Sequence, residues 1–159
     1  MNILFITSYP SDHSPANSIF VYRLVQELVS LGCNITVIAP QQWRAKRGLL
    51  CEQPGEKRYG FEGATVYRPK YFDFPNRLKL GNLSAGRLNA TTYKQAAKRV
   101  VKNLDFKPNV IYTHFLYRGG PAAVDLAKLL DVPAVVALGE SSMEKHEPIF
   151  TRAAMKKTA

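Results

Sequence analysis

The sequence lacks the features that several common protein classes require. Its two cysteines, Cys33 and Cys51, show no CxxC or Cys/His spacing, so the chain needs neither a disulfide framework nor a structural zinc ion. No apolar run approaches the ~18 residues that cross a bilayer, and the first residues form a predicted strand rather than a signal peptide. We therefore expect a reduced, cytoplasmic protein whose 159 residues form one domain.

Motifs that bind nucleotides or form a nucleophile elbow are also missing. Residues 8–18 contain no glycine, whereas a dinucleotide site uses G-x-G-x-x-G to let the backbone approach a pyrophosphate. The chain has no G-x-x-x-x-G-K-[ST] loop, and residues 139–143 (GESSM) lack the closing glycine of the G-x-S-x-G elbow. These absences disfavour enzymes that use NAD or FAD, P-loop nucleoside triphosphatases and serine hydrolases.

The first forty residues carry the patterns of a strand, an amphipathic helix and a second strand. Residues 2–7 and 34–39 are short apolar runs, typical of strands buried on both faces of a parallel sheet. Between them, apolar residues recur at helical spacing, and Gly32 stands where a left-handed helix end favours glycine. A strand, a crossover helix and a parallel strand predict a right-handed unit of an open, doubly wound sheet.

The rest of the chain extends this pattern. We predict strands at residues 64–68, 108–113 and 133–138, a long loop at 71–81, and helices that begin near Ser84 and Gly119. The strand ends then bring His114 and Glu140 to the same rim as residues 8–18, where such sheets bind ligands. The predicted fold class is α/β, with a Rossmann-like, doubly wound, mainly parallel sheet and helices on both faces.

Positive charge is concentrated in the middle of the chain. Residues 44–107 contain 15 Lys and Arg against 5 Asp and Glu, whereas the remainder contains 7 of each kind. A basic section of this kind indicates an anionic partner, either nucleic acid or the negatively charged inner leaflet of a membrane. The alternative is an ordinary solvated face.

Five segments occur in an order and spacing that are more specific together than singly. They are residues 1–10 (MNILFITSYP), 19–28 (IFVYRLVQEL), 31–40 (LGCNITVIAP), 109–117 (NVIYTHFLY) and 132–140 (VPAVVALGE). Together they resemble the amino-terminal domain of family-four, GT-B-type glycosyltransferases. The resemblance implies two Rossmann-like domains across a cleft, with the acceptor held mostly by the first and the nucleotide sugar mostly by the second. Residues 1–159 would then be a single acceptor-side domain without its donor-binding partner, and would not catalyse transfer alone.

The resemblance also points to candidate acceptor-binding residues. In many members the first loop holds paired glycines that let backbone amides approach a phosphate, whereas this chain has Ala16, Asn17 and Ser18 there. Asn17 and Ser18 either present the helix amino end to an anionic acceptor or only cap the helix. His114 either contacts an acceptor hydroxyl or phosphate or fixes the strand end.

A second departure from the family pattern concerns the catalytic group. In many members the fifth strand ends in a histidine near the transferred sugar, where this chain has Gly139 followed by Glu140. Glu140 is therefore the candidate catalytic carboxylate, which hydrogen-bonds an acceptor hydroxyl or accepts its proton, and Ser141 joins the acceptor-binding set. The alternative for Glu140 is a cap for the following helix. The spacing of His114, Glu140 and His146 does not support a metal site, and we expect no cofactor and no metal requirement.

The resemblance implies a retaining, hexosyltransferase-like enzyme with a nucleotide sugar as donor. Its acceptor would be a polysaccharide intermediate or a lipid-linked sugar at the inner face of the membrane, with residues 44–107 in peripheral contact with anionic lipid. No nucleic-acid partner is expected in that case. Two alternatives stay open: a non-catalytic basic α/β module that binds nucleic acid or anionic surfaces, which steep salt dependence would favour, and half of a sugar-nucleotide epimerase.

Overall fold

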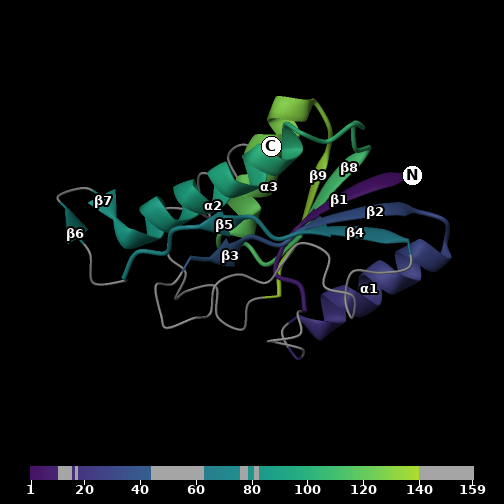
Figure 1. Ribbon diagram of the computed structural model, residues 1–159, viewed down its shortest axis with the longest axis horizontal. Coiled ribbons are helices and arrows are strands. Elements are labelled where there is room, and N and C mark those ends of the chain that lie inside the picture. Colours follow the sequence, from purple (N-terminus) through teal and green to yellow (C-terminus); the bar gives the residue numbers. More distant parts are fainter. Residues whose placement is uncertain (11–15, 17, 44–62, 76–78, 81–82, 140–159) are drawn as a thin grey trace.

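A parallel sheet of five strands forms the centre of the protein. The computed structural model describes residues 1–10, 16, 18–43, 63–75, 79–80 and 83–139. The sheet contains β1 (Asn2–Ile6), β2 (Asn34–Ile38), β4 (Ala64–Tyr67), β8 (Val110–His114) and β9 (Ala134–Ala137), in the order β4-β2-β1-β8-β9 (Figure 1). All neighbouring strands run parallel. The strand order reverses between β1 and β8, which is the switch point where such sheets bind ligands at their carboxyl edge.

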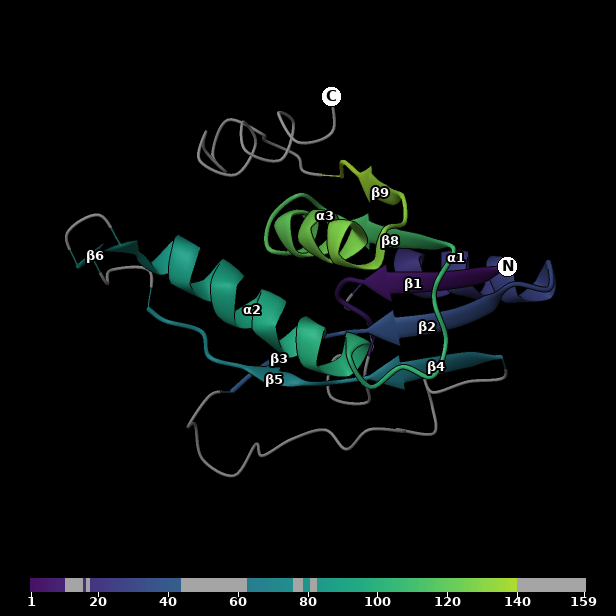
Figure 2. The ribbon, with the colours of Figure 1, turned by 90° about the horizontal axis from the view of Figure 1, so that it is seen from above.

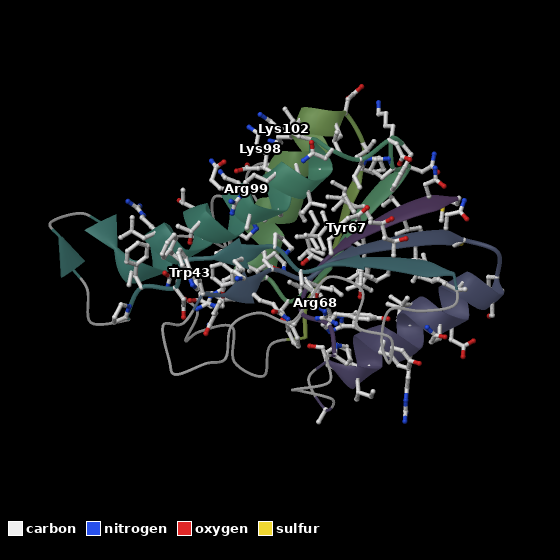
Figure 3. All side chains as sticks on the ribbon, viewed as in Figure 1. Trp43, Tyr67, Arg68, Lys98, Arg99 and Lys102 are labelled. Carbon is white, nitrogen blue, oxygen red and sulfur yellow. The ribbon has the colours of Figure 1, made fainter. Side chains whose placement is uncertain are left out.

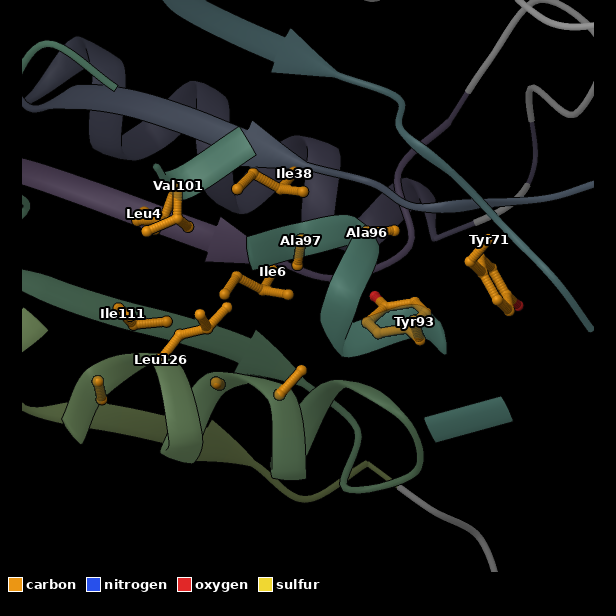
Figure 4. Close-up of a cluster of buried hydrophobic side chains, with 13 residues drawn as sticks. Leu4, Ile6, Ile38, Tyr71, Tyr93, Ala96, Ala97, Val101, Ile111 and Leu126 are labelled. Carbon is orange, nitrogen blue, oxygen red and sulfur yellow. The ribbon is translucent and has the colours of Figure 1, made fainter. Parts of the chain in front are cut away.

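Helices cover both faces of this sheet, as the predicted α/β class requires. Helix α1 (Ile19–Ser30) lies on one face, and α2 (Ala85–Val101) and α3 (Gly119–Leu130) lie on the other (Figures 1 and 2). Alternate side chains of β1 point to opposite faces. Ile3 and Phe5 pack with α1, whereas Leu4 and Ile6 pack with α2 and α3 (Figure 4). Each face therefore has its own apolar cluster, and the Rossmann-like fold class is confirmed.

The principal elements begin and end within about two residues of their predicted bounds, as expected because the ends of helices and strands fray. The end of α1 follows the predicted glycine signal. Gly32 adopts a φ of +78°, and the N–H groups of Gly32 and Cys33 donate to the carbonyls of Val29 and Leu28. This left-handed turn satisfies carbonyls at the helix end and sends the chain into β2.

The predicted loop at residues 71–81 is wrong in part. A second parallel pair, β3 (Gln41–Gln42) and β5 (Lys70–Tyr71), follows β2 and β4 beyond Pro40 and Pro69. Proline has no N–H, so it interrupts a ladder of strand hydrogen bonds, which resumes here when Gln41 donates to the Pro69 carbonyl at 2.9 Å. A short antiparallel pair, β6 (Lys79–Leu80) and β7 (Leu83–Ser84), precedes α2. The β3–β5 pair carries the chain past the sheet edge and buries Tyr71.

Candidate functional site

A cavity of about 420 Å³ lies at the carboxyl edge of the sheet, at the switch point between β1 and β8. Strand ends and the turn before α3 supply most of its wall, and two buried tyrosines from β5 and α2 supply the rest. The lining includes Thr7, Ser8, Tyr71, Tyr93, His114, Phe115, Arg118, Gly119 and Gly139. Segments far apart in the sequence therefore meet at one concave site, as the sheet topology predicts.

The turn between β8 and α3 has a backbone that most residues avoid. Phe115 and Arg118 have φ values of +73° and +61°, in the left-handed region that costs non-glycine residues free energy. Gly119 packs so tightly that a Cβ there would lie 2.3 Å from Thr113 Oγ1. That hydroxyl donates to the Ile6 carbonyl at 2.7 Å, so the first residue of α3 rests directly on the sheet. Backbone strain of this kind is concentrated at ligand-binding sites.

His114, the last residue of β8, lines the cavity with its ring held on several sides. Its Nδ1 lies 2.9 Å from the Tyr112 hydroxyl, and its ring centroid lies 4.6 Å from those of Phe20 and Phe115. Burial raises the pKa of the Tyr112 phenol, so its hydroxyl keeps its proton at neutral pH. If the Tyr112 hydroxyl donates to Nδ1, the ring hydrogen lies on Nε2, and Nε2 can then donate a hydrogen bond.

Gly139 explains how the His114 ring fits. A Cβ at position 139 would lie 2.8 Å from His114 Nε2 and 2.9 Å from Phe115 Cε1. Real Cβ atoms are essentially never found under 3.0 Å from another heavy atom, so any side chain here would force one of the two rings to move. Gly139, which stands where many members of the resembled family have a histidine, thus leaves space for the ring of His114 at the end of β8.

Among the described residues that line the cavity, Arg118 alone has a side chain that is charged at every physiological pH. Its guanidinium donates from Nη1 to the Tyr71 hydroxyl and from Nη2 to Asp73 Oδ1, the latter at 2.8 Å. The Arg118 and Asp73 side chains are 20% and 13% exposed, so water screens the pair little. Burial also raises the pKa of Tyr71, which therefore stays protonated as the acceptor of this bond. The network ties the start of α3 to the segment after β5.

The structure brings one predicted site residue to the cavity and places another elsewhere. His114 lines the cavity, whereas Ser18 is not among the lining residues. Ser18 stands at the N-cap position of α1 with a φ of +55°, and its side chain makes no capping hydrogen bond. Asn17, Glu140 and Ser141 lie outside the described residues. In the described part of the chain, no cluster of His, Cys, Asp or Glu side chains is large enough to hold a metal ion.

Comparison with known proteins identifies the family. The model of the glycosyl transferase 4-like domain matches residues 18–156. The chain belongs to this glycosyltransferase family. As a glycosyl transferase 4-like domain, it is 32% identical over 166 residues to TuaC of Bacillus subtilis (strain 168), whose name assigns it provisionally to teichuronic acid biosynthesis as a glycosyltransferase. That alignment covers 98% of this chain but only 40% of TuaC.

Two solved structures share the fold of this glycosyl transferase 4-like domain. The calicheamicin glycosyltransferase CalG4 superposes with a TM-score of 0.55 at 20% identity, over 99% of this chain and 35% of CalG4. The C-terminal domain of a Pyrococcus furiosus hydrogenase superposes with a TM-score of 0.51 at 14% identity, over 86% of this chain and 90% of that one. At these identities the likeness concerns the fold alone. The family match and the fold confirm the predicted amino-terminal domain of a GT-B-type glycosyltransferase.

Proposed function

We propose that this domain is the acceptor-side half of a retaining glycosyltransferase. The full-length enzyme would transfer a hexose from a nucleotide sugar to a polysaccharide or lipid-linked acceptor, with a separate domain holding the donor. The observation that carries the proposal is the cavity at the β1–β8 switch point, which His114 lines in a glycosyl transferase 4-like domain. The name of TuaC, which refers to teichuronic acid biosynthesis, supports the acceptor class.

The lining residues suit the recognition of a sugar. The side chains of Thr7 and Ser8 can donate to and accept from acceptor hydroxyls, and His114 can bind one at its ring. The amino end of α3, which begins at Gly119 in the lining, favours an oxygen-rich or anionic group, while the charge of Arg118 beside it is shared with Asp73. Our proposal keeps Glu140 as the catalytic carboxylate, and Asn17, Ser18 and Ser141 as acceptor-side candidates.

The test is a nucleotide-sugar turnover assay on the full-length protein, followed by the His114→Ala variant. Loss of a group that hydrogen-bonds the acceptor should lower the rate of transfer about tenfold to a hundredfold. Leu129→Ala is the control, because Leu129 is 53% exposed on α3 and does not line the cavity. If His114→Ala transfers sugar at the parent rate, the acceptor does not bind in this cavity. If the full-length protein turns over none of the nucleotide sugars, the transferase assignment is contradicted.

Peripheral contact with an anionic membrane is the second part of the proposal. Arg99 and Lys102 are exposed on and just after α2, beside Lys98 (Figure 3). Three cations of the basic section make contacts within the domain: Arg99 donates to the Lys70 carbonyl at 3.0 Å, Arg68 is buried and donates to the Pro10 carbonyl, and Lys94 pairs with Asp125 at 2.7 Å. None of the helices in the described ranges has the length and apolarity to span a bilayer.

Partition onto vesicles tests this contact. Each basic residue near an anionic surface adds about 1 kcal/mol, so Lys98→Glu with Lys102→Glu should weaken binding to vesicles rich in phosphatidylserine at least tenfold. Lys128→Glu with Arg23→Glu, which reverses two exposed cations on α3 and α1, is the charge-matched control. Equal partition onto neutral and anionic vesicles would overturn the membrane contact. Steeply salt-dependent binding to random oligonucleotides would instead favour the nucleic-acid alternative.

A further inference from the structure

Phe20 is an exposed aromatic residue at the start of α1 that the core does not use. It leaves 43% of its surface exposed, whereas Val21 and Val25 supply the buried contacts of the same helix. The cluster that joins α1 to the sheet contains no Phe20. Its ring contacts two other aromatic rings, His114 at 4.6 Å between centroids and Phe115 edge-on at 5.8 Å. Phe20 therefore packs against the residues that line the cavity rather than into the core.

These contacts place Phe20 at the rim of the cavity. His114 and Phe115 both line it, and Gly139 beside them has no side chain to cover their rings. The polar side of the His114 ring is oriented by the Tyr112 hydroxyl at Nδ1. The rim thus combines an exposed aromatic surface with a fixed imidazole that can hydrogen-bond. A pyranose ring has the matching character, because one face presents C–H groups and its edge carries hydroxyls.

We propose that Phe20 and His114 form a stacking subsite for one pyranose ring of the acceptor. The C–H face of the sugar would lie on the Phe20 ring, whose negative face attracts polarised hydrogens, while a ring hydroxyl meets His114. The subsite rests on the proposed acceptor-side function and narrows it to a specific sugar contact. A long acyl chain would need only apolar area, and the experiment separates it from a stacked sugar.

The experiment measures binding of methyl β-glucoside, methyl β-galactoside and methyl β-N-acetylglucosaminide to the full-length protein by saturation-transfer NMR. Phe20→Ala should raise the dissociation constant of the tightest of the three about fivefold to tenfold. Phe20→Tyr, which keeps the ring, should stay within about twofold, and Phe20→Leu, which keeps apolar bulk without the ring, should resemble Phe20→Ala. Phe72→Ala is the matched control, because Phe72 is 53% exposed, contacts Trp43 and does not line the cavity.

Each outcome supports or overturns the subsite. Binding that follows the presence of the aromatic ring supports it. Failure of all three glycosides to bind, equal binding by Phe20→Ala, or full binding by Phe20→Leu overturns it, the last because apolar bulk alone would then suffice. The proposed function is judged separately by nucleotide-sugar turnover. Turnover together with glycoside binding that does not depend on Phe20 would support the transferase and overturn the subsite. Glycoside binding that depends on Phe20, without turnover, would support a sugar-binding subsite and contradict the transferase.

Discussion

At the scale of single residues, Gly139 and His114 occupy a space that holds only one side chain. The missing Cβ at position 139 is what allows the His114 ring to lie where it does, 2.8 Å from the point that a Cβ would take. His114 ends β8, and Gly139 lies two residues after β9, whose last residue Ala137 pairs with His114 in the ladder. A change at position 139 should therefore act through His114.

Gly139→Ala should displace the His114 ring and lower sugar transfer by the full-length enzyme about as much as His114→Ala does. The physical reason is steric, since the new methyl group overlaps Nε2 and a Phe115 ring carbon. The direct measurement is the chemical shift of the His114 ring protons in the selectively labelled protein. In the His114→Ala background, Gly139→Ala should have little further effect, which is the signature of coupled residues.

Gly32→Ala is the matched control for this prediction. A Cβ at Gly32 would meet nothing within 4 Å, although its φ of +78° makes alanine strained. It should cost about 1 kcal/mol of stability and leave the His114 resonances and transfer unchanged. An unmoved His114 signal in Gly139→Ala would contradict the steric coupling.

The sequence predicted His114 but missed Arg118, and the difference has a physical cause. A histidine directly after a buried apolar run must reach the ligand edge of a parallel sheet, so local pattern suffices. A cation just before a helix amino end is opposed by the helix dipole. Arg118 is stable there because Asp73 and Tyr71 accept its hydrogen bonds, and these residues lie 45 and 47 positions away. Its position immediately before Gly119 and Gly120 was the one available signal.

At the scale of elements, Asn89 fixes the segment after β5 to helix α2. Asn89 is fully buried, and its Oδ1 accepts the Phe74 N–H at 2.6 Å while its Nδ2 donates to the Phe74 carbonyl at 3.1 Å. Thr92 donates to the Phe72 carbonyl from the next turn of the helix. These side-chain hydrogen bonds therefore hold residues 72–75 in place without strand pairing, so that Asp73 lies within hydrogen-bond distance of Arg118. The sequence pattern shows Asn89 only as a polar gap in an apolar stripe.

Asn89→Ala should lower the free energy of unfolding of this chain by about 2–3 kcal/mol, because two partly buried backbone groups lose their partner. Urea unfolding monitored by circular dichroism measures the change. Asn103→Ala is the control of the same residue type, since Asn103 is exposed and its side-chain amide donates to the Arg99 carbonyl. That variant should cost less than about 1 kcal/mol. Equal losses in the two variants would mean that the Asn89 clamp contributes no more than a surface contact.

At the scale of the whole molecule, the sheet and its helices could be predicted, whereas the part of the cavity wall that Tyr71 supplies could not. Five apolar runs and their crossover helices indicate a parallel sheet, because the βαβ connection has one hand and buries both faces. Pro40 and Pro69 directly follow the strands predicted at residues 34–39 and 64–68, yet the ladder resumes past them in β3 and β5. That continuation buries Tyr71 and closes one side of the cavity, and it depends on pairing between segments about thirty residues apart, which periodicity does not report.

The same burial makes the stability of the whole molecule sensitive to alkali. Burial raises the pKa of Tyr9, Tyr71 and Tyr93, whereas a phenol in the unfolded chain titrates near 10. Below that pH both states keep the protons. Above it the unfolded chain releases protons that the folded chain retains, so the free energy of unfolding falls by about 1.4 kcal/mol per pH unit for each such tyrosine.

Tyr93→Phe removes one titrating phenol and should make the decline with pH shallower, by about half a proton at pH 10 and by close to one proton at pH 11. Urea unfolding at intervals between about pH 9 and pH 11 measures the slope, and Lys and Arg titrate alike in both proteins, so the difference isolates the phenol. Tyr67→Phe, which removes a phenol from a side chain that is 37% exposed, is the control and should leave the slope of the parent chain. A Tyr93→Phe slope equal to that of the parent chain would mean that this phenol titrates alike in the folded and unfolded states, and that the packing of Tyr93 against Tyr71 beside Arg118 does not exclude water.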